Sequence, residues 1–435
     1  MNQQNKHFCI PQNNLPIIVV IGAGFAGINF IKKLDNQPVQ LVLLDQNNFH
    51  QFQPLLYQVA ISGLEPDAVV SPVRKLFKTC INLIYRMAKV EKIDTKNNCV
   101  YTDVGFIKYD FLVIATGSST NFFESKNIEK YSIGLKNIHD AINIRSWMLQ
   151  NLEKAVDSCN ITNKEALTRF VIVGGGPAGV EMAGALAEFK KYLLNNDYPE
   201  IDPTAMKVSL IQSGNRILPA MSEKASNHAL KVLKELEVEV LLNSKVKDYN
   251  GEEITIVTEN GEITIASETL IWAGGVKGNT LNGIDESTIV AGNRISVNEY
   301  NQVKGLENVF AIGDIAAMIT NSNPKGHPMV AQVAIQQGQT LAKNILSKIN
   351  HGIFRKPFNY NDKGSMATIG KKDAVADLKI TFLNGRIGWV LWSFIHLISI
   401  TGFKNKFKVG FNWMLKYFSY DKANQLIIRK YKRNE

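Results

Sequence analysis

The stretch of residues 17–27 constrains the fold of this chain more than any other part of the sequence. It reads Ile-Ile-Val-Val-Ile-Gly-Ala-Gly-Phe-Ala-Gly, so a run of β-branched residues leads directly into a Gly-x-Gly-x-x-Gly pattern. The run predicts a fully buried strand. In the pattern, the first glycine permits a tight turn, the second lets the backbone approach a pyrophosphate, and the third lets the next helix pack on the strand. That helix, expected over about residues 28–34, would point its N-terminal amides at the phosphates.

Glycine-rich loops often make only turns, so the residues around the pattern decide its meaning. A second apolar strand is expected over residues 39–44, and Asp45 ends it. A carboxylate about 20 residues after the loop can accept hydrogen bonds from the two hydroxyls of a ribose. Strand, loop, helix, strand and acid together predict an α/β dinucleotide-binding domain.

The same pattern recurs later in the chain. Residues 170–181 read Phe-Val-Ile-Val-Gly-Gly-Gly-Pro-Ala-Gly-Val-Glu, and Gly174 follows Gly22 by 152 positions. Repetition with the same flanks predicts a second Rossmann-like domain. After the next expected strand, over residues 207–211, Gln212 stands where the ribose acid would fall. An amide can bond the ribose but does not repel a 2′-phosphate, so we expect weakened discrimination against NADPH.

Three other strand ends carry small or acidic residues. The strand expected from residue 109 ends in Ala115-Thr116-Gly117, where small side chains let the chain turn tightly beneath a cofactor. Residues 270–276 are expected to close the second domain with a strand and a turn that contains Gly274. The strand over residues 309–312 runs into Gly-Asp, and in flavoproteins with two dinucleotide domains an aspartate such as Asp314 accepts from the ribityl chain. The simpler alternative for Asp314 is a turn at a strand end.

Composition indicates an ordinary globular protein of two or three domains, with 435 residues, 45% apolar and 20% charged. Its four cysteines are widely separated and form no Cys-x-x-Cys pair. This argues against a disulfide framework or a zinc site, suits a reducing compartment, and leaves no predicted metal site.

Most of the formal charge of +10 lies near the C-terminus, because residues 386–435 hold ten Lys/Arg against two acids. The apolar run over residues 387–401 is shorter than the about 20 residues that a spanning helix needs. Lysines and aromatic residues alternate after it, which suits a helix lying in a membrane interface on anionic lipid. The residues concerned are Lys404, Lys406 and Lys408 with Phe403, Phe407, Phe411, Trp413, Met414, Phe418 and Tyr420. A domain-covering or dimer-forming helix is the alternative; nucleic-acid binding is not expected, since no binding module is present.

The sequence resembles the type II NADH dehydrogenases, which are single-chain NADH:quinone oxidoreductases. Beyond the two glycine loops, the resemblance rests on Asn-Phe-His-Gln-Phe-Gln-Pro-Leu-Leu-Tyr-Gln-Val-Ala at 48–60, Trp-Ala-Gly-Gly-Val at 272–276, Ala-Gln-Val-Ala-Ile-Gln-Gln-Gly at 331–338 and Ser-Met-Ala-Thr-Ile-Gly at 365–370. It continues through Gly-Trp at 388–389, His-Leu at 396–397 and Gly-Phe-Lys-Asn-Lys at 402–406. Disulfide-reducing flavoenzymes carry a cysteine pair after the ribose acid, and residues 46–60 contain no cysteine.

The resemblance implies FAD in the first site and NADH, possibly NADPH, in the second. The residues expected to bind FAD are Gly22, Gly24, Phe25, Ala26, Gly27, Asp45, Ala115, Thr116, Gly117, Asp314, Ala331 and Gln332. Those expected to bind the nicotinamide nucleotide are Gly174, Gly176, Pro177, Ala178, Gly179, Glu181, Gln212 and Gly274.

Three residues are expected to take part in catalysis: Glu181, Gln332 and Gln336. In the family the matching glutamate lies near the flavin and the nicotinamide, and the matching glutamines lie near the isoalloxazine and the quinone pocket. The glutamines are four apart and so share one face of a helix, where neutral amides can bond flavin or quinone carbonyls. A surface position is the alternative for Gln336, and stabilising the first turn of a helix is the alternative for Glu181. Ile335 stands where relatives can have a histidine, which leaves the proton route open.

The predicted organisation follows from these assignments. It comprises a disordered tail (1–14), a discontinuous FAD-binding domain (15–137 and 286–385), a linker helix (138–165), an NAD(P)H-binding domain (166–285) and a basic aromatic membrane-anchoring region (386–435).

The expected activity is that of a respiratory-type, non-proton-pumping NADH:quinone oxidoreductase, in which a hydride passes from NADH to FAD and two electrons then pass to membrane quinone. We expect a homodimer bound peripherally to the cytoplasmic face of the cell membrane. One alternative is an NADH-binding flavoprotein redox sensor with little turnover. The other is a related flavin reductase, such as a sulfide:quinone or ferredoxin reductase.

Overall fold

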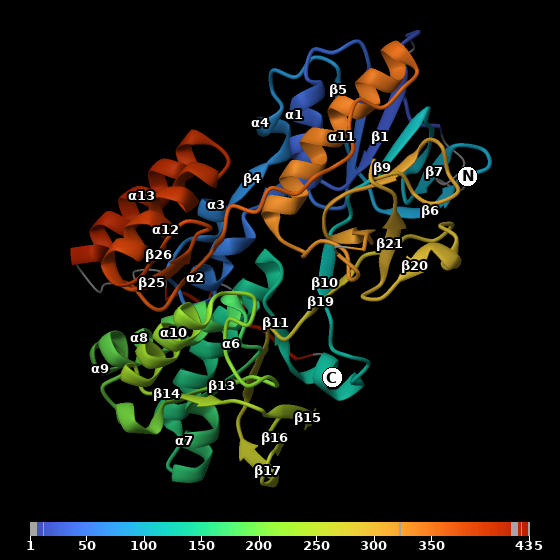
Figure 1. Cartoon of the computed structure of the whole chain (residues 1–435). Helices are drawn as coiled ribbons and strands as arrows, with labels where there is room; N and C mark the ends of the chain where they lie inside the picture. The colour runs from blue at the N-terminus through green and yellow to red at the C-terminus, as the bar shows by residue number, and fades with distance from the viewer. Residues whose placement is uncertain (1–6, 12, 322, 419–424, 428, 434–435) are drawn as a thin grey trace. The chain divides into compact units, whose positions relative to one another are not determined.

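The computed structural model describes residues 7–11, 13–321, 323–418, 425–427 and 429–433. Its contacts divide the chain into two units, neither of which is continuous in sequence (Figure 1). Unit 1 comprises Met1–His50, Ser71–Ser119 and Val276–Asp362, and unit 2 comprises Gln51–Val70, Thr120–Gly275 and Lys363–Glu435. The segment 51–70, which follows the first ribose acid, therefore packs with unit 2.

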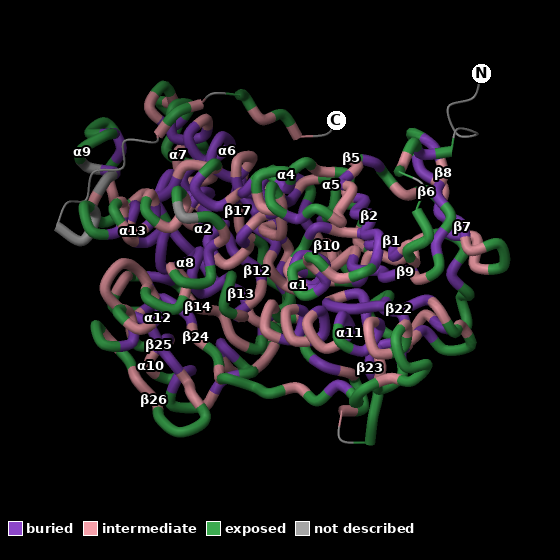
Figure 2. The backbone as a smooth tube through the Cα atoms, turned by 90° about the horizontal axis from the view of Figure 1, so that it is seen from above, coloured by how far each residue is buried: buried purple, intermediate pink, exposed green. Residues whose placement is uncertain are grey.

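A five-stranded parallel sheet forms the centre of unit 1. In spatial order its strands are β22 (Val309–Ala311), β9 (Phe111–Ile114), β1 (Ile17–Ile21), β2 (Gln40–Asp45) and β5 (Leu83–Met87). Val19 on the central strand pairs with Val42 on one side and Leu112 on the other. These positions are fully buried, as the continuous apolar runs predicted, and Figure 2 shows the sheet as a buried layer.

Two helices of unit 1 meet at the start of the first glycine loop's helix. They are α1 (Phe25–Leu34) and α11 (Ala331–His351), which lie side by side in Figure 1. A Cβ added to Gly338 on α11 would lie 2.4 Å from the carbonyl oxygen of Ala26, so only glycine allows this approach. The close crossing brings α11 directly onto the first turn of α1.

Unit 2 repeats this architecture. Its parallel sheet has the order β11 (Ile133–Gly134), β18 (Thr269–Trp272), β12 (Arg169–Val173), β13 (Lys207–Ile211) and β14 (Val238–Leu241). The helices are α6 (Ile138–Asp157), α8 (Pro177–Phe189) and α10 (Glu223–Glu235). A helix was predicted over residues 138–165; α6 begins at Ile138 as expected, where a capping box between Asn137 and Asp140 fixes its start, but it ends at Asp157 and a separate helix begins at Ile161.

Each unit also carries an antiparallel three-stranded sheet. It consists of β6 (Val90–Asp94), β7 (Cys99–Thr102) and β8 (Gly105–Lys108) in unit 1, and of β15 (Lys245–Tyr249), β16 (Glu253–Thr258) and β17 (Gly261–Ala266) in unit 2. Residues 7–11, assigned from sequence to a disordered tail, pack in unit 1. Phe8 is buried and its backbone N–H donates to the carbonyl of Phe106, because an apolar ring gains more from the core than from water.

The C-terminal part of unit 2 is a small sheet followed by two helices. The sheet consists of β24 (Ser365–Thr368), β25 (Ala374–Asp377) and β26 (Phe382–Leu383), and the helices are α12 (Gly385–Ser399) and α13 (Phe403–Phe418). The short helices α2 (Leu56–Ala60) and α3 (Pro66–Val69) belong to the same unit. Over the described residues, none of the helices combines the length and apolarity needed to cross a membrane. Tyr420 and the side chains of Phe403 and Phe418 lie outside what the structure describes.

The remaining helices and strands are short. The strands are β3 (Phe49–Gln51), β4 (Val70–Pro72), β10 (Ser118–Thr120), β19 (Val276–Gly278), β20 (Ile289–Val290), β21 (Arg294–Val297) and β23 (Ala316–Met318). The helices are α4 (Val73–Leu76), α5 (Lys126–Tyr131), α7 (Ile161–Thr168) and α9 (Asn195–Asp197).

The segment 429–433 returns to α6 and the β15–β17 sheet of unit 2 instead of continuing α13. The Arg433 guanidinium lies 4.4 Å from the centroid of the Trp147 ring and donates to the carbonyl of Gly251 and the hydroxyl of Tyr249. Tyr431 meets Trp147 edge to face. Part of the basic C-terminal region predicted to face a membrane is thus engaged with α6 and the β15–β17 sheet, through cation–π contacts and hydrogen bonds of the guanidinium to carbonyl acceptors.

Candidate functional site

The first glycine loop has the geometry of a nucleotide cradle. Gly22 has a φ of +110°, and a Cβ there would lie 2.3 Å from the carbonyl oxygen of Ala115. A Cβ at Gly27 would lie 2.0 Å from the carbonyl oxygen of Gly22. Both positions therefore require glycine. At Gly24, the N-cap of α1, an added Cβ meets nothing within 4 Å and no side chain caps the helix. The N-terminal amides of α1 are thus open to an anionic ligand.

Asp45 holds this loop from the end of β2. Its Oδ2 accepts from the backbone N–H of Ala23 at 2.6 Å, and its Oδ1 accepts from that of Asn47 at 2.7 Å. Burial raises the pKa of this carboxyl, and the hydrogen bonds from Ala23 and Asn47 oppose the shift. The carboxyl group lies beside the glycine loop, as expected for a ribose acceptor.

The other predicted residues of the first site gather around the same end of the sheet. Gly313 has a φ of +77°, and a Cβ there would lie 3.1 Å from Cβ of Ala26, so the Gly-Asp turn rests on the first turn of α1. The hydroxyl of Ser118, next to Gly117, donates to Asp314. Thr116 exchanges hydrogen bonds with Asn279: its hydroxyl donates to the Asn279 carbonyl at 2.7 Å, and the Asn279 amide donates to its carbonyl at 3.1 Å. Asp314 and Thr116 are thus fixed near the loop by two residues that sequence reasoning missed.

His50 is a third residue that sequence reasoning missed. It is buried, and its Nδ1 lies 2.9 Å from the carbonyl oxygen of Ala23, while its ring meets Phe25 edge to face. Because a carbonyl only accepts, Nδ1 carries the proton. Burial lowers the pKa of His50 to about 4, so the imidazole is neutral at physiological pH. Its position five residues after Asp45 was the available signal, since that segment was expected near the cofactor.

The glutamines of α11 have different surroundings. Gln337 is buried and its Oε1 accepts from the backbone N–H of Gly313 at 2.7 Å, so it fixes the Gly-Asp turn. Both ends of the Gln336 amide are bonded to the backbone of Asn361, at 2.9 and 3.0 Å. Gln332 is half-buried in the first turn of α11, after Ala331. Ligand binding by Gln336 would require its release from Asn361, whereas Gln337 has a structural role that the motif did not indicate.

The second glycine loop repeats the first. Gly174 has a φ of +106° and its added Cβ would lie 2.5 Å from the carbonyl oxygen of Ala273, while that of Gly179 would lie 1.9 Å from the oxygen of Gly174. Gly176 again is an uncapped N-cap with nothing within 4 Å of an added Cβ. Pro177 occupies the first helical position, where its missing N–H costs nothing. Pro177 and Ala178 are exposed, so this loop also presents an open face.

Gln212 takes the place of Asp45 in the second loop. Its Oε1 accepts from the backbone N–H of Gly175 at 2.8 Å. The amide therefore supports the loop as the carboxylate does in unit 1, without a charge. Gly274 lies behind the loop, where an added Cβ would touch Trp272 and Val173 at 3.4 Å.

Glu181 does not lie in the first turn of its helix, where the sequence placed it. It is the fifth residue of α8, after the start at Pro177, and it is only 7% exposed. Its Oε1 accepts a long hydrogen bond of 3.4 Å from the backbone N–H of Thr368, whose side chain is buried. Burial raises the pKa of Glu181 to about 8, and this hydrogen bond opposes the shift. The carboxyl group is thus a proton donor or acceptor near neutral pH rather than a helix-stabilising charge.

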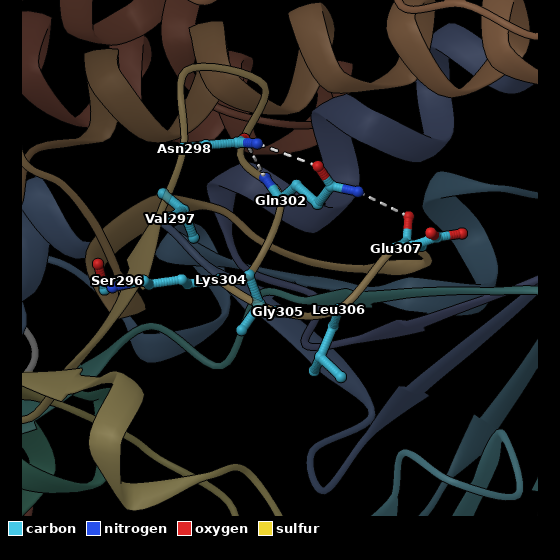
Figure 3. Close-up of a pocket in the computed structure, with 9 residues that line it drawn as sticks. Ser296, Val297, Asn298, Gln302, Lys304, Gly305, Leu306 and Glu307 are labelled. Atoms are coloured by element: carbon cyan, nitrogen blue, oxygen red, sulfur yellow. Dashed lines mark hydrogen bonds between the residues drawn. The ribbon is translucent and has the colours of Figure 1, made fainter.

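A surface cavity of about 500 Å³ in unit 1 lies at β21 and the loop after it (Figure 3). The amide of Gln302 in its wall is bonded to Asn298 and to the carbonyl of Glu307. Its lining contains none of the predicted site residues, so it is separate from the nucleotide loops.

Known proteins are similar to this chain in both sequence and fold. Residues 16–338 match the family model of the pyridine nucleotide-disulphide oxidoreductases, and residues 363–419 match that of the NDH2 C-terminal domain. The type II NADH:quinone oxidoreductase Ndh of Mycobacterium tuberculosis is 33% identical over 413 residues, covering 92% of this chain and 88% of that protein.

Two solved structures show how widely the fold is shared. NDH2 from Plasmodium falciparum in complex with NADH superposes with a TM-score of 0.86 at 22% identity, covering 95% of this chain and all of that one. The sulfide:quinone oxidoreductase from Aquifex aeolicus has a TM-score of 0.69 at 20% identity, covering 95% of this chain and 93% of that one.

Proposed function

We propose that this chain, which belongs to the family of type II NADH:quinone oxidoreductases, transfers electrons from NADH to a quinone. The observation that carries the proposal is the pair of open glycine loops, one in each unit, with the same backbone geometry. Electron transfer between two nucleotide cofactors needs two dinucleotide seats. The chain provides both.

The residues of unit 1 fit FAD. The open Cβ position at Gly24 and the uncapped start of α1 suit a pyrophosphate, and Asp45 offers its carboxylate to a ribose. Asp314, held by Ser118, lies on the same side as an acceptor for further hydroxyls. When bound, FAD would accept a hydride from NADH and pass two electrons to a quinone.

The residues of unit 2 fit the nicotinamide nucleotide. Gly176 and the exposed start of α8 suit the pyrophosphate, and Gln212 stands at the ribose position. Glu181 would hold or release a proton at its carboxyl group. The order of the sheet strands supports the same assignment, because the loop follows the central strand in both units.

The membrane contact is proposed for α12 and α13. Large apolar side chains on these helices are open to solvent; they include Ile387, Val390, Phe394, Ile398, Phe407, Phe411, Met414 and Leu415, and Phe407 is 65% exposed. Contiguous exposed apolar residues mark an interaction surface. With the lysines of α13, this surface suits anionic lipid, from which a quinone is reached. A peripheral position on the cytoplasmic face and a homodimer are proposed from the family resemblance.

Steady-state kinetics of FAD-loaded protein test the activity. We expect rapid oxidation of NADH when a soluble quinone is added, and little oxidation without it. A stable reduced flavin with little turnover in the presence of quinone would favour a redox sensor. NADPH in place of NADH measures the selectivity of the second seat, and light scattering of the same sample measures the oligomeric state.

Membrane binding is best tested by substitution rather than by truncation, because removal of the C-terminal residues also removes the contacts of Arg433. Phe407→Glu with Phe411→Glu should abolish sedimentation with anionic vesicles. Ile161→Glu, at an apolar residue on α7 that is more exposed than either phenylalanine, is the control and should bind as the wild type does. Undiminished vesicle binding by the double variant would refute the proposed surface.

A further inference from the structure

A series of hydrogen bonds crosses unit 2 from α13 to α8, and at Thr368 the side chain makes one bond of the series and the backbone makes the next. The indole Nε1 of Trp413 donates to Oε1 of Gln58 at 2.9 Å, and Nε2 of Gln58 lies 2.9 Å from the hydroxyl of Tyr57. That hydroxyl lies 2.9 Å from Oγ1 of Thr368. The backbone N–H of Thr368 then donates to Glu181. The series therefore joins the helix proposed to meet the membrane to the one ionisable carboxyl of the second candidate site.

Apart from Gln58, which is half-buried, the residues of this series are shielded from water. Thr368 is 1% exposed, and Tyr57, Glu181 and Trp413 are each below a tenth exposed. In such surroundings a hydrogen bond is stronger than in water, and a lost partner leaves an unsatisfied group. Loss of one hydrogen bond in the series is therefore expected to disturb the position of the next residue.

The hydrogen bonds from Trp413 to Tyr57 also have a fixed donor-to-acceptor direction. An indole N–H can only donate, so the Gln58 oxygen must face Trp413 and its NH₂ group must face Tyr57. Because Tyr57 accepts that bond, its own proton is free to point at Thr368. The hydrogen bond to Tyr57 therefore anchors the Thr368 side chain, and the backbone N–H of the same residue donates to Glu181, where a donor favours the charged form of the carboxyl.

We propose that Gln58 and Tyr57 are positioning residues that connect Trp413 on α13 to Glu181 on α8, so that the seating of α13 sets how readily Glu181 ionises. The effect of this connection on turnover rests on the proposed function. Its effect on the ionisation of Glu181 does not depend on that function. Glu181 itself is the group that would contact the nucleotide.

The electrostatic surroundings are consistent with this arrangement. The negative charge of Glu181 raises the pKa of Tyr57, after burial, which places the two groups close enough to interact. Glu188 on α8 also acts on Tyr57 and accepts from the backbone of Lys371. On α10, which also packs on α8, His228 is paired with Asp373. Burial, which raises the pKa of Glu181, and the backbone donor of Thr368, which lowers it, are the two influences on that carboxyl.

Infrared titration of the holoenzyme measures the carboxyl directly, with Glu181→Gln identifying its signal. Tyr57→Phe should shift the titration midpoint of Glu181 upward by about one pH unit, since it removes the donor nearest Thr368. Gln58→Leu should shift it less, and Trp413→Phe least, because each is one bond farther away.

Matched controls are present in the same unit. Tyr198→Phe removes a buried hydroxyl that donates to Glu153, and Trp147→Phe removes an equally exposed indole that donates to the carbonyl of Glu268. Neither should move the Glu181 midpoint. If the controls move it as much as the variants of this series do, general loosening explains the effect and the proposal fails.

Double variants distinguish a connection from separate effects. If the residues act in series, Trp413→Phe added to Tyr57→Phe should produce no further shift. Additive shifts, or no shift in any single variant, would overturn the proposal. Stopped-flow measurement of the rate at which NADH reduces the flavin, over the same pH range, tests the proposed function separately. A moved midpoint with an unchanged rate profile would uphold the connection and instead refute the role of Glu181 in turnover.

Discussion

The two glycine loops have nearly the same backbone but differ in what surrounds them. Gly22 and Gly174 have φ values of +110° and +106°, and both loops begin their helices with an open, uncapped glycine. In unit 1 the strand-end side chain is a carboxylate with two backbone donors, whereas in unit 2 it is a neutral amide with one. The proposed binding sites thus share a backbone that suits a pyrophosphate, and we expect the side chain at the strand end to determine which nucleotide each site prefers.

The coverage of the two seats differs as well. The first turn of α1 is crossed by Gly338 and by the Gly313 turn, so Ala26 is buried. The matching residue in unit 2, Ala178, is exposed. A covered seat suits a cofactor that stays bound, and an open seat suits a nucleotide that exchanges each turnover.

The largest effect should come from alanine at the open glycines. At Gly24 and Gly176 the added methyl meets no protein atom within 4 Å, and φ is −76° and −74°, so folding should be undisturbed. The methyl would instead occupy the approach to the pyrophosphate. We expect Gly24→Ala to lose FAD on dialysis, and Gly176→Ala to keep FAD while its KM for NADH rises roughly a hundredfold. Flavin absorbance and initial rates measure both.

Gly27→Ala is the contrasting variant, because its methyl would lie 2.0 Å from a backbone oxygen and should destabilise unit 1 itself. Full flavin content in Gly24→Ala would show that the seat tolerates a side chain, and the comparison of the loops would fail.

A smaller effect is expected from restoring the acid in the second loop. Gln212→Glu should raise the preference for NADH over NADPH roughly tenfold to a hundredfold, because a carboxylate repels the 2′-phosphate. The specificity constants for the two nucleotides provide the measurement. A wild-type preference for NADH above about a thousandfold, roughly 4 kcal/mol, would show that the neutral amide already discriminates.

Arg216 should affect nucleotide selectivity less than residue 212 does, and it should act only on the use of NADPH. It stands four residues after Gln212, half-buried, with Nη2 donating to the carbonyl of Pro219 at 2.8 Å. A guanidinium in this loop can meet a 2′-phosphate. Arg216→Ala should lower kcat/KM for NADPH about fivefold and leave that for NADH unchanged. An equal loss for both nucleotides would indicate damage to the loop.

The smallest effect concerns stability. Burial raises the pKa of Asp45 in the folded state above its unfolded value of 3.8. The stability that this group contributes is therefore present in acid and lost as pH rises through the folded pKa. FAD-free Asp45→Asn should melt about 2 °C above the wild type at pH 7, with the gap closing toward pH 4. Gln212→Glu should show the opposite sign, since it introduces a half-buried carboxylate; equal melting of Asp45→Asn and wild type at pH 7 would contradict this account.

Much of the fold followed from local patterns. The buried strands, the two glycine loops and helix α6 were predicted because apolar periodicity, glycine spacing and capping residues act over short distances. The positions of Gly22, Gly24, Gly174 and Gly176 relative to their strands were part of the same pattern.

The parts that were missed depend on contacts between distant segments. Glu181 is buried because residues from 365 onward cover α8, and Gln337 rather than Gln336 faces the Gly-Asp turn because of how α11 crosses α1. Segment 51–70 packs with unit 2 although it continues directly from unit 1. No short window of sequence contains these partners.

The contacts of Arg433 have a consequence for how the chain is made. Unit 1 has all of its segments once residue 362 has been synthesised, whereas unit 2 still lacks the residue that lies on Trp147 and Tyr249. Domains fold as their sequence emerges from the ribosome, and distant pairings form slowly. We therefore expect unit 1, for which we propose FAD, to reach its native state first, and unit 2, for which we propose the nicotinamide nucleotide, to fold last.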